Sequence, residues 1–145
     1  MTGMQDIGEL LGGRKCLGRA LRTTTDMDAL IREGLPVACA SQMQSSLALP
    51  DRSLADLLAL GTRTLVRLRQ DNKRLSLAAG DRLFRLARIF SLATEVLEDQ
   101  QAARRWLLAP QAGLGGQRPL DLMLTEAGSR QVEELLGRIE YGVLA

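Results

Sequence analysis

The side chains that most often carry catalysis are scarce in this chain of 145 residues. It contains no histidine, which excludes Ser-His-Asp and Cys-His catalysis, imidazole proton transfer and every zinc site with a histidine ligand. Its two cysteines, Cys16 and Cys39, lie outside any C-x-x-C spacing and are too few to hold a structural zinc ion without other ligands. We interpret them as reduced thiols of an intracellular protein.

The C-terminal third also lacks a catalytic arrangement. After Leu97 the carboxylates are scattered over expected helix surfaces, and no nucleophile has a neighbouring base to activate it. The Gly115-Gly116 pair is not followed by the Lys-Ser or Lys-Thr of a phosphate-binding loop. The sequence therefore predicts neither an enzyme nor a site for a metal or a cofactor.

The chemistry that the sequence does offer is electrostatic. The formal net charge is only +2, but residues 62–90 hold eight basic and two acidic side chains, a local charge of +6. After Leu97 five basic side chains face seven acidic ones, a local charge of −2. This division indicates a polyanion-binding region followed by a region with a different partner. The alternative is a solvated helix surface, and charge alone does not decide between them.

Neither secretion nor membrane insertion is supported by the sequence. The first 13 residues carry acidic side chains where a signal peptide has basic ones. The longest uncharged stretch, residues 34–50, is interrupted by Pro36, Gln42, Gln44 and three serines, so it cannot form a membrane-spanning helix. We expect a soluble cytoplasmic protein with no membrane partner.

The element pattern predicts an all-α fold. Aromatic residues make up only 3% of the chain while leucine recurs every few residues, a bias that favours helices over strands. Residues 1–25 are expected to form an arm with one loose helical turn, and residues 111–118 a glycine-containing loop. Helices are expected to cover residues 26–32, 37–47, 53–60, 62–69, 76–97, 99–109, 119–123 and 125–141. The expected caps are Asp26, Ser53, Thr62, Ser76, Asp99 and Thr125, and Pro119 is expected to open the short helix at 119–123.

The longest expected helix carries a continuous apolar stripe. Its apolar residues alternate in steps of four and three, which places them on one face, and further apolar residues broaden that face. We interpret this helix as the element that joins the two halves of the chain, and the width of its stripe suggests a homodimer. Gly80 interrupts it at a cost of about 1 kcal/mol relative to an ordinary helix former. The stripe consists of Ala79, Leu83, Leu86, Phe90, Ala93 and Leu97.

Residues 55–65 have the features of a helix-turn-helix motif. Ala55 allows close approach of two short helices, Gly61 is expected to make the turn in the left-handed conformation, and Leu58 and Leu65 are spaced to pin both helices on one core. This segment resembles the lambda-repressor-like, or Xre, family of DNA-binding domains. It departs from many members at Ala59, where they have glycine.

In that geometry the start of the second helix faces base edges, and basic side chains further along reach phosphates. The alternative is that Thr62 only caps the helix and the arginines only keep it soluble. The base-edge candidates are Thr62, Arg63, Thr64 and Arg67, and the phosphate candidates are Arg69, Lys73 and Arg74.

The C-terminal third resembles the toxin-binding domain of the Xre/MbcA/ParS antitoxins. Several motifs occur in the order found in that family, and the resemblance extends upstream through Leu10-Leu11-Gly12-Gly13, residues 32–36 (REGLP) and residues 63–65 (RTL). It therefore covers nearly the whole chain. The C-terminal motifs are residues 103–110 (ARRWLLAP), 114–116 (LGG), 118–122 (RPLDL), 125–128 (TEAG) and 138–142 (RIEYG).

The resemblance implies an antitoxin of a type II toxin-antitoxin pair, with no enzymatic activity of its own. One expected partner is a RES-domain toxin that consumes NAD, and the C-terminal domain is expected to cover the nucleotide pocket of this toxin. The other is operator DNA, which the chain is expected to bind as a dimer to repress its operon. Arg138, Glu140, Tyr141 and Gly142 are the candidates for toxin contact, because tyrosine and arginine are common interface anchors and nothing further in the chain can cover them. The expected core residues of this domain are Trp106, Leu120, Leu122 and Leu136, and Gly115, Gly116 and Gly128 are expected to meet backbone requirements.

Two other functions fit the same pattern. One is a stand-alone transcriptional regulator whose C-terminal part only dimerises, and the other is a polar-localisation or scaffold role, which no residue favours. The expected domains are an arm at 1–25, a helix-turn-helix domain at 26–97 and a toxin-binding domain at 98–145.

Overall fold

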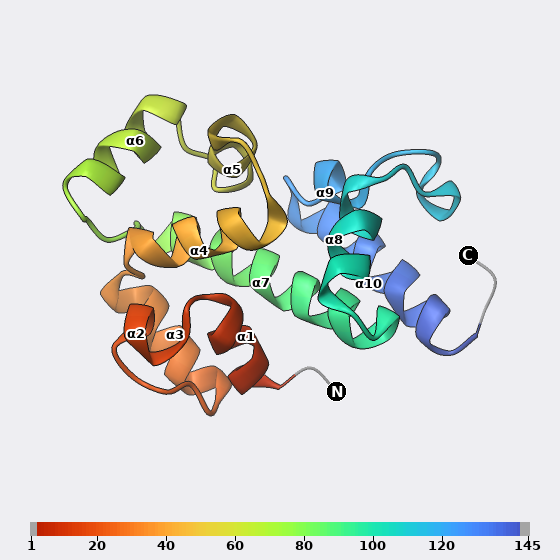
Figure 1. The fold of residues 1–145 in the computed structure, drawn as a ribbon, viewed down its shortest axis with the longest axis horizontal. Helices are drawn as coiled ribbons and strands as arrows, with labels where there is room; N and C mark the ends of the chain where they lie inside the picture. The colour runs from red at the N-terminus through yellow and green to blue at the C-terminus, as the bar shows by residue number, and fades with distance from the viewer. Residues whose placement is uncertain (1–2, 143–145) are drawn as a thin grey trace. The chain divides into compact units, whose positions relative to one another are not determined.

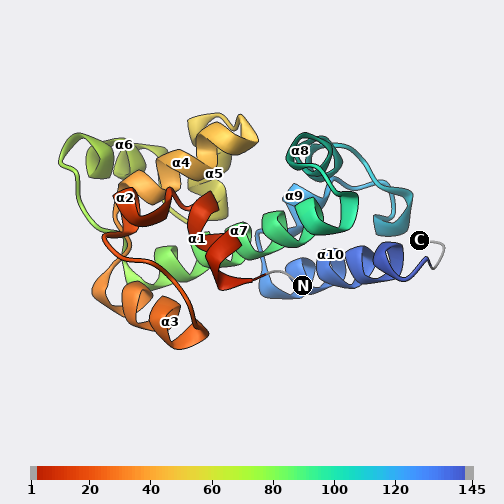
Figure 2. The ribbon, with the colours of Figure 1, turned by 60° about the horizontal axis from the view of Figure 1, so that its bottom comes forward.

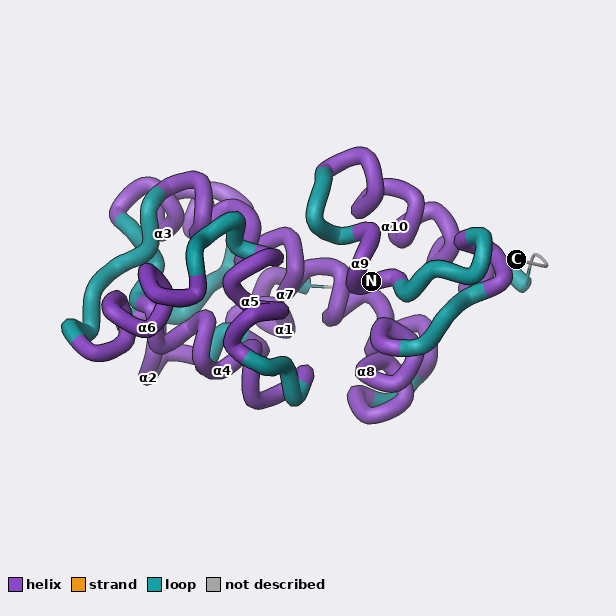
Figure 3. The backbone as a smooth tube through the Cα atoms, turned by 90° about the horizontal axis from the view of Figure 1, so that it is seen from above, coloured by secondary structure: helices purple, strands orange, loops and turns teal. Residues whose placement is uncertain are grey.

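The computed structural model describes residues 3–142, and these form helices and connecting loops with no strand (Figure 3). The all-α prediction is therefore confirmed. Contacts divide the chain into an N-terminal unit ending at Ala87 and a C-terminal unit beginning at Arg88. The division falls within α7 (Leu77–Leu97), earlier in the chain than the expected boundary after residue 97. Over the described residues, no helix combines the length and the hydropathy needed to cross a membrane.

Helix α4 is the centre of the N-terminal unit. It contacts α1, α2, α5 and α6, and Figure 1 shows α5 and α6 on one side of it and α1 to α3 on the other. Its apolar side chains at Val37, Cys39, Ala40, Met43 and Leu47 are all buried, as expected for a helix covered on several sides. The unit consists of α1 (Met4–Leu10), α2 (Gly13–Leu17), α3 (Thr24–Glu33), α4 (Val37–Leu47), α5 (Asp51–Leu57), α6 (Thr62–Gln70) and the first part of α7.

The first 25 residues do not form an arm. They contain α1 and α2, and Ile7, Leu11, Leu17 and Leu21 are each at most 6% exposed. Both helices pack on α4. The prediction was wrong because these four apolar residues are too few to show a period in the sequence, while α4 offers them a surface to cover.

Two of the expected helix starts are also wrong. Helix α3 is capped by Thr23 rather than Asp26, and the two form a capping box: Thr23 Oγ1 accepts from the Asp26 amide at 3.1 Å and Asp26 Oδ2 accepts from the Thr23 amide at 3.0 Å. Helix α5 begins at Asp51, so Ser53 lies inside it and caps nothing. By contrast, the cap at Ser76 is confirmed, because its hydroxyl accepts from the Ala79 amide at 3.2 Å.

The apolar stripe of α7 is used within the chain. Ala79, Leu83, Leu86, Phe90 and Ala93 are each at most 2% exposed. Side chains already buried in one copy cannot supply the contact surface for a second. These five residues therefore cannot form the dimer interface that the stripe was expected to provide, whereas Leu97 at its end is half-buried, and the homodimer stays a prediction.

The C-terminal unit is built around α9, which contacts both α8 and α10 (Figure 2). The expected caps at Asp99 and Thr125 are confirmed, because their side chains accept from the Ala102 and Gly128 amides, each at 2.9 Å. The expected loop at 111–118 contains one short 3-10 turn. Beyond the end of α7 the unit consists of α8 (Gln100–Leu108), the 3-10 turn η1 (Ala112–Leu114), α9 (Pro119–Leu122) and α10 (Glu126–Glu140).

Leucines on α9 and α10 form much of the core of this unit. Leu120 and Leu136 are buried as expected, whereas Trp106 and Leu122 are only half-buried. Gly128 is required by close approach, because a Cβ there would lie 1.8 Å from the carbonyl oxygen of Leu122. The first turn of α10 therefore touches the end of α9 backbone to backbone.

Two glycines inside helices are expected to respond to alanine in opposite directions. A Cβ at Gly80 would meet Ile31 and Leu35 at 3.7 Å, an ordinary contact, so Gly80→Ala should stabilise the chain by about 1 kcal/mol through helix propensity. Gly128→Ala should destabilise it by about 2–3 kcal/mol because Leu122 must move. Urea unfolding followed by circular dichroism measures both. A stability loss for Gly80→Ala would show that α3 and α7 pack more tightly than this geometry implies.

Candidate nucleic-acid and protein interfaces

Helices α5 and α6 pack against each other and form the expected helix-turn-helix pair. The turn differs in its residue: Ala59 adopts the left-handed conformation at φ +56°, whereas Gly61 is extended at φ −69° and precedes α6 as its N-cap. The Leu60 amide donates to the Ala55 carbonyl at 2.8 Å and closes the end of α5. Many members of the resembled family have glycine at this position. An alanine there pays about 1–2 kcal/mol for the left-handed conformation, which glycine adopts without that cost.

Helix α6 exposes most of its surface. Leu65 is its one buried residue, and Thr62, Arg63, Thr64 and Arg67 are all exposed. Thr62 is the first helical residue rather than the cap, which corrects its expected role.

A helix advances by about 100° per residue, so Thr62, Arg63 and Arg67 share one face of α6. On the same wheel Thr64 lies about 60° beyond Arg67, at the edge of this face, and it is also exposed. Val66 and Gln70 lie on the shared face and are exposed, although neither was singled out from the sequence. The sequence could have identified both, because Val66 and Gln70 follow Thr62 by four and eight residues, the spacing of one helix face. We call the set Thr62, Arg63, Val66, Arg67 and Gln70 the α6 face.

Arg69 faces its own chain. Its Nη2 donates to Asp51 Oδ1 at 2.8 Å and its Nη1 to Gln44 Oε1 at 3.1 Å. Gln44 Nε2 in turn donates to Asp51 Oδ1 at 2.7 Å. The hydrogen bonds from Gln44 and Arg69 hold the pKa of Asp51 below its usual value of 3.8, so the carboxylate is charged at neutral pH. This network joins α6 to α4 and to the start of α5.

The other two phosphate candidates follow α6 in the chain. Lys73 and Arg74 line a hollow of about 600 Å³ together with Arg67 and the turn residues Asp71 and Asn72. Arg74 also donates through Nη1 to the carbonyl of Gly34 at 2.6 Å, which ties this turn to the end of α3. Arg67, Lys73 and Arg74 are therefore brought to one region of the surface.

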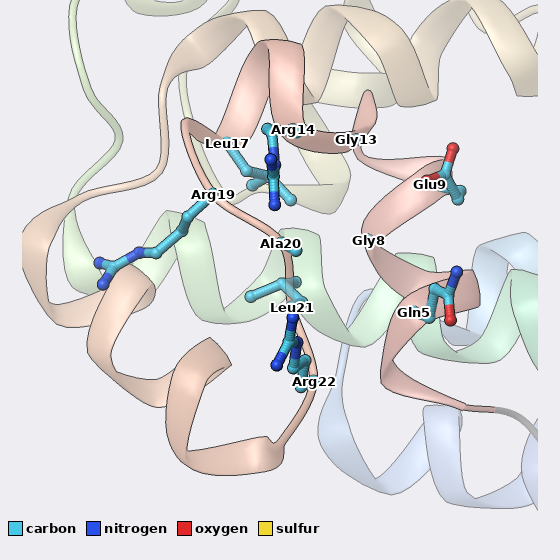
Figure 4. Close-up of a pocket in the computed structure, with 10 residues that line it drawn as sticks. All are labelled: Gln5, Gly8, Glu9, Gly13, Arg14, Leu17, Arg19, Ala20, Leu21 and Arg22. Atoms are coloured by element: carbon cyan, nitrogen blue, oxygen red, sulfur yellow. The ribbon is translucent and has the colours of Figure 1, made fainter.

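A second hollow, of about 340 Å³, lies between α1, α2 and the segment that follows them (Figure 4). Three arginines line it, but Arg19 points away from the hollow in Figure 4 and pairs with Glu33 at 2.6 Å. The cysteines do not create a metal site: both are free thiols, and burial raises the pKa of Cys39 to about 12. No group of three cysteine or acidic side chains in residues 3–142 is arranged to hold a metal ion.

The four candidates at the end of the C-terminal unit lie together at the last turn of α10. Tyr141 follows the helix and is 82% exposed, Glu140 is exposed and Arg138 is half-buried. Gly142 has φ +73°, so the chain leaves the helix through a left-handed residue. A large aromatic side chain with this exposure, beside a cation, is the composition of an interface anchor.

Two family models match the chain, one in each unit. The "Antitoxin Xre-like helix-turn-helix domain" matches residues 26–88 and includes α5 and α6. The "Antitoxin Xre/MbcA/ParS C-terminal toxin-binding domain" matches residues 92–142 and ends at the exposed last turn of α10. The interval between the two matches lies next to the contact division at Arg88.

Curated relatives are similar over most of the chain. An "Antitoxin Xre" of Photorhabdus laumondii is 26% identical over 82% of this chain and 81% of its own length. An "Antitoxin Xre" of Yersinia enterocolitica is 28% identical over 87% and 85%, respectively. A "Prs ADP-ribosylating antitoxin" of a Sphingobium species is 26% identical over 90% and 87%. The chain therefore belongs to the Xre-type antitoxins, with a helix-turn-helix domain followed by a C-terminal toxin-binding domain.

Proposed function

We propose that the chain inhibits a RES-domain toxin by covering its NAD-binding site, and that it represses its own operon as a DNA-bound dimer or toxin complex. The observation that carries the first part is the exposed Tyr141 at the end of the matched toxin-binding domain. The name of the Sphingobium relative supports NAD as the nucleotide, because ADP-ribosylation draws its ADP-ribose from NAD. Inhibition by occlusion needs no bond to be made or broken.

The contact with the toxin is assigned to the last turn of α10 and the residues after it. Tyr141 supplies a large surface with few rotatable bonds, and Arg138 and Glu140 supply charged hydrogen-bonding groups beside it. Gly142 allows the chain to turn away from the helix axis.

The contact with DNA is assigned to α6 and the turn after it. Thr62, Arg63, Thr64 and Arg67 face base edges, with Thr64 at the edge of the face beyond Arg67, and Lys73 and Arg74 reach phosphates. A dimer would place two copies of α6 in successive major grooves, about 34 Å apart. Its interface lies outside the buried stripe of α7.

Arg63→Ala and Lys73→Ala are expected to weaken DNA binding in different ways. Arg63→Ala should cost about 1–3 kcal/mol on the operator and little on a random duplex, because it removes a base contact. Lys73→Ala should weaken both duplexes and lower the slope of log K against log salt by about one, because it removes a phosphate contact. Fluorescence anisotropy with the promoter duplex and a scrambled duplex, at four salt concentrations, measures both. Equal losses on the two duplexes for Arg63→Ala would refute its assignment.

Arg69 is a phosphate candidate whose hydrogen bonds assign it a positioning role instead. If it positions α6, Arg69→Ala should lower the stability of the chain by about 1 kcal/mol and leave the salt slope unchanged. Asp51→Asn is the matched control, because it weakens the same network without removing a cation. Thermal unfolding and the salt titration measure the two effects. A salt slope lowered by one for Arg69→Ala, but not for Asp51→Asn, would establish a phosphate contact.

Tyr141→Ala is expected to abolish protection against the toxin while the chain stays folded, because the side chain is 82% exposed and contributes nothing to the core. The measurement is growth of cells that express the toxin gene adjacent to this gene, with co-purification of the two proteins. Leu124→Ala is the matched control: it is also an exposed apolar residue of this unit, 47% exposed, but it precedes the opposite end of α10.

The two interfaces should separate genetically. Arg63→Ala should lose repression and keep protection, whereas Tyr141→Ala should lose protection and keep operator binding. If the wild-type chain protects against no adjacent gene product yet binds its promoter, the stand-alone regulator is the better description. If Leu124→Ala alone loses protection, the toxin contact lies at the other end of α10.

A further inference from the structure

We propose that Val66 determines operator specificity by packing against the C5-methyl group of a thymine. This inference rests on the proposed DNA-binding function and deepens it, because it assigns a base and a chemical group to a residue outside the expected contact set. The single observation behind it is an apolar side chain exposed on the flank of the helix face that carries Arg63 and Arg67.

Val66 lies on the α6 face, one turn after Thr62 and next to Arg67 in the chain. Its exposed fraction is 36%, whereas Leu65 beside it is fully buried. The other members of the face, Thr62, Arg63, Arg67 and Gln70, are polar or cationic. In a helix-turn-helix domain the N-terminal half of this helix enters the major groove. The thymine methyl is the one apolar group that a standard base pair presents there.

Helix stability does not account for a valine at this position. A β-branched side chain loses χ1 freedom in a helix, and at an exposed site alanine is the stronger helix former. Val66 is partly covered by its own chain, but with 36% of it exposed it leaves apolar surface for a partner, whereas the fully buried Leu65 leaves none. Helix propensity therefore does not explain the valine, and its uncovered apolar surface is available for a contact outside the chain.

The charge around Val66 favours DNA over a protein as that contact. Helix α6 contains three arginines and no acidic residue. A protein that covered Val66 with an apolar surface would also have to desolvate Arg63 and Arg67, at a high cost unless it supplied acidic partners. A duplex supplies base-edge acceptors for Arg63 and Arg67 and a methyl group for Val66 in one groove.

The test is a double-mutant cycle between the full-length chain and its promoter duplex. After footprinting on the DNA upstream of its own gene, each thymine in the footprint is replaced in turn by deoxyuridine, which lacks only the methyl group. At one thymine of a half-site the wild-type chain should lose about three- to five-fold in affinity, the value of one buried methyl group. Val66→Ala should bind the unmodified duplex more weakly by a similar factor and should not respond to the same replacement. Its thermal midpoint should stay within a few degrees of that of the wild type, because Val66 is only partly covered in the folded chain.

Leu77→Ala is the control variant, because Leu77 is an exposed apolar residue of the same unit, 56% exposed, at the start of α7 and outside the α6 face. It should keep the response of the wild type to deoxyuridine. If every replacement affects the wild type and Val66→Ala equally, the methyl contact is refuted while DNA binding stands. If Val66→Ala loses protection against the toxin but still discriminates deoxyuridine from thymine, Val66 contacts a protein, and the methyl contact is refuted as well. If the wild-type chain binds its promoter no more tightly than a random duplex, both the proposed DNA binding and this inference are refuted.

Discussion

Helix α6 is attached to the rest of the N-terminal unit through one fully buried side chain, that of Leu65. Leu65 fixes which side of the helix faces the core, and the half-buried Leu68 adds a weaker contact on the same side. The Arg69 hydrogen bonds to Asp51 and Gln44 supply a second point of attachment, one turn further along. With both in place, the remaining surface of α6 is presented outward in one orientation, and a DNA-reading helix needs this because a groove contact depends on the angle of entry.

The local charge of +6 at residues 62–90 overstates the surface that a polyanion can reach. Arg69 is bound to Asp51, and Arg88 belongs to the C-terminal unit, where it pairs with Glu133 at 3.1 Å. A sum over sequence counts such cations equally with the exposed Arg63 and Lys73. The sequence could therefore predict that this region is cationic and which helix carries the charge. It could not separate cations that hold the fold from cations that face outward, because their partners lie far away in the chain.

The same distinction separates the correct fold predictions from the wrong ones. The caps at Asp99 and Thr125 were predictable because a cap joins a side chain to a backbone amide three residues away. The turn of the helix-turn-helix motif was misplaced because glycine is the usual left-handed residue, yet Ala59 takes that conformation and Gly61 is extended. Helices α1 and α2 were missed because Leu11 and its neighbours gain their burial from α4, some thirty residues later. Local chemistry was readable, and tertiary burial was not.

The C-terminal unit positions its exposed end by constraints at the opposite end of the same helix. Thr125 fixes where α10 begins, and Gly128 lets its first turn approach the Leu122 carbonyl more closely than any side chain would allow. Val132 and Leu136, both buried, then fix the rotation of the helix about its axis. Because an α-helix is a stiff rod with a set rise per residue, these contacts determine where the last turn and Tyr141 are presented. The residues that place each interface are thus distinct from the residues that form it, so a surface side chain can change its partner preference without altering the fold.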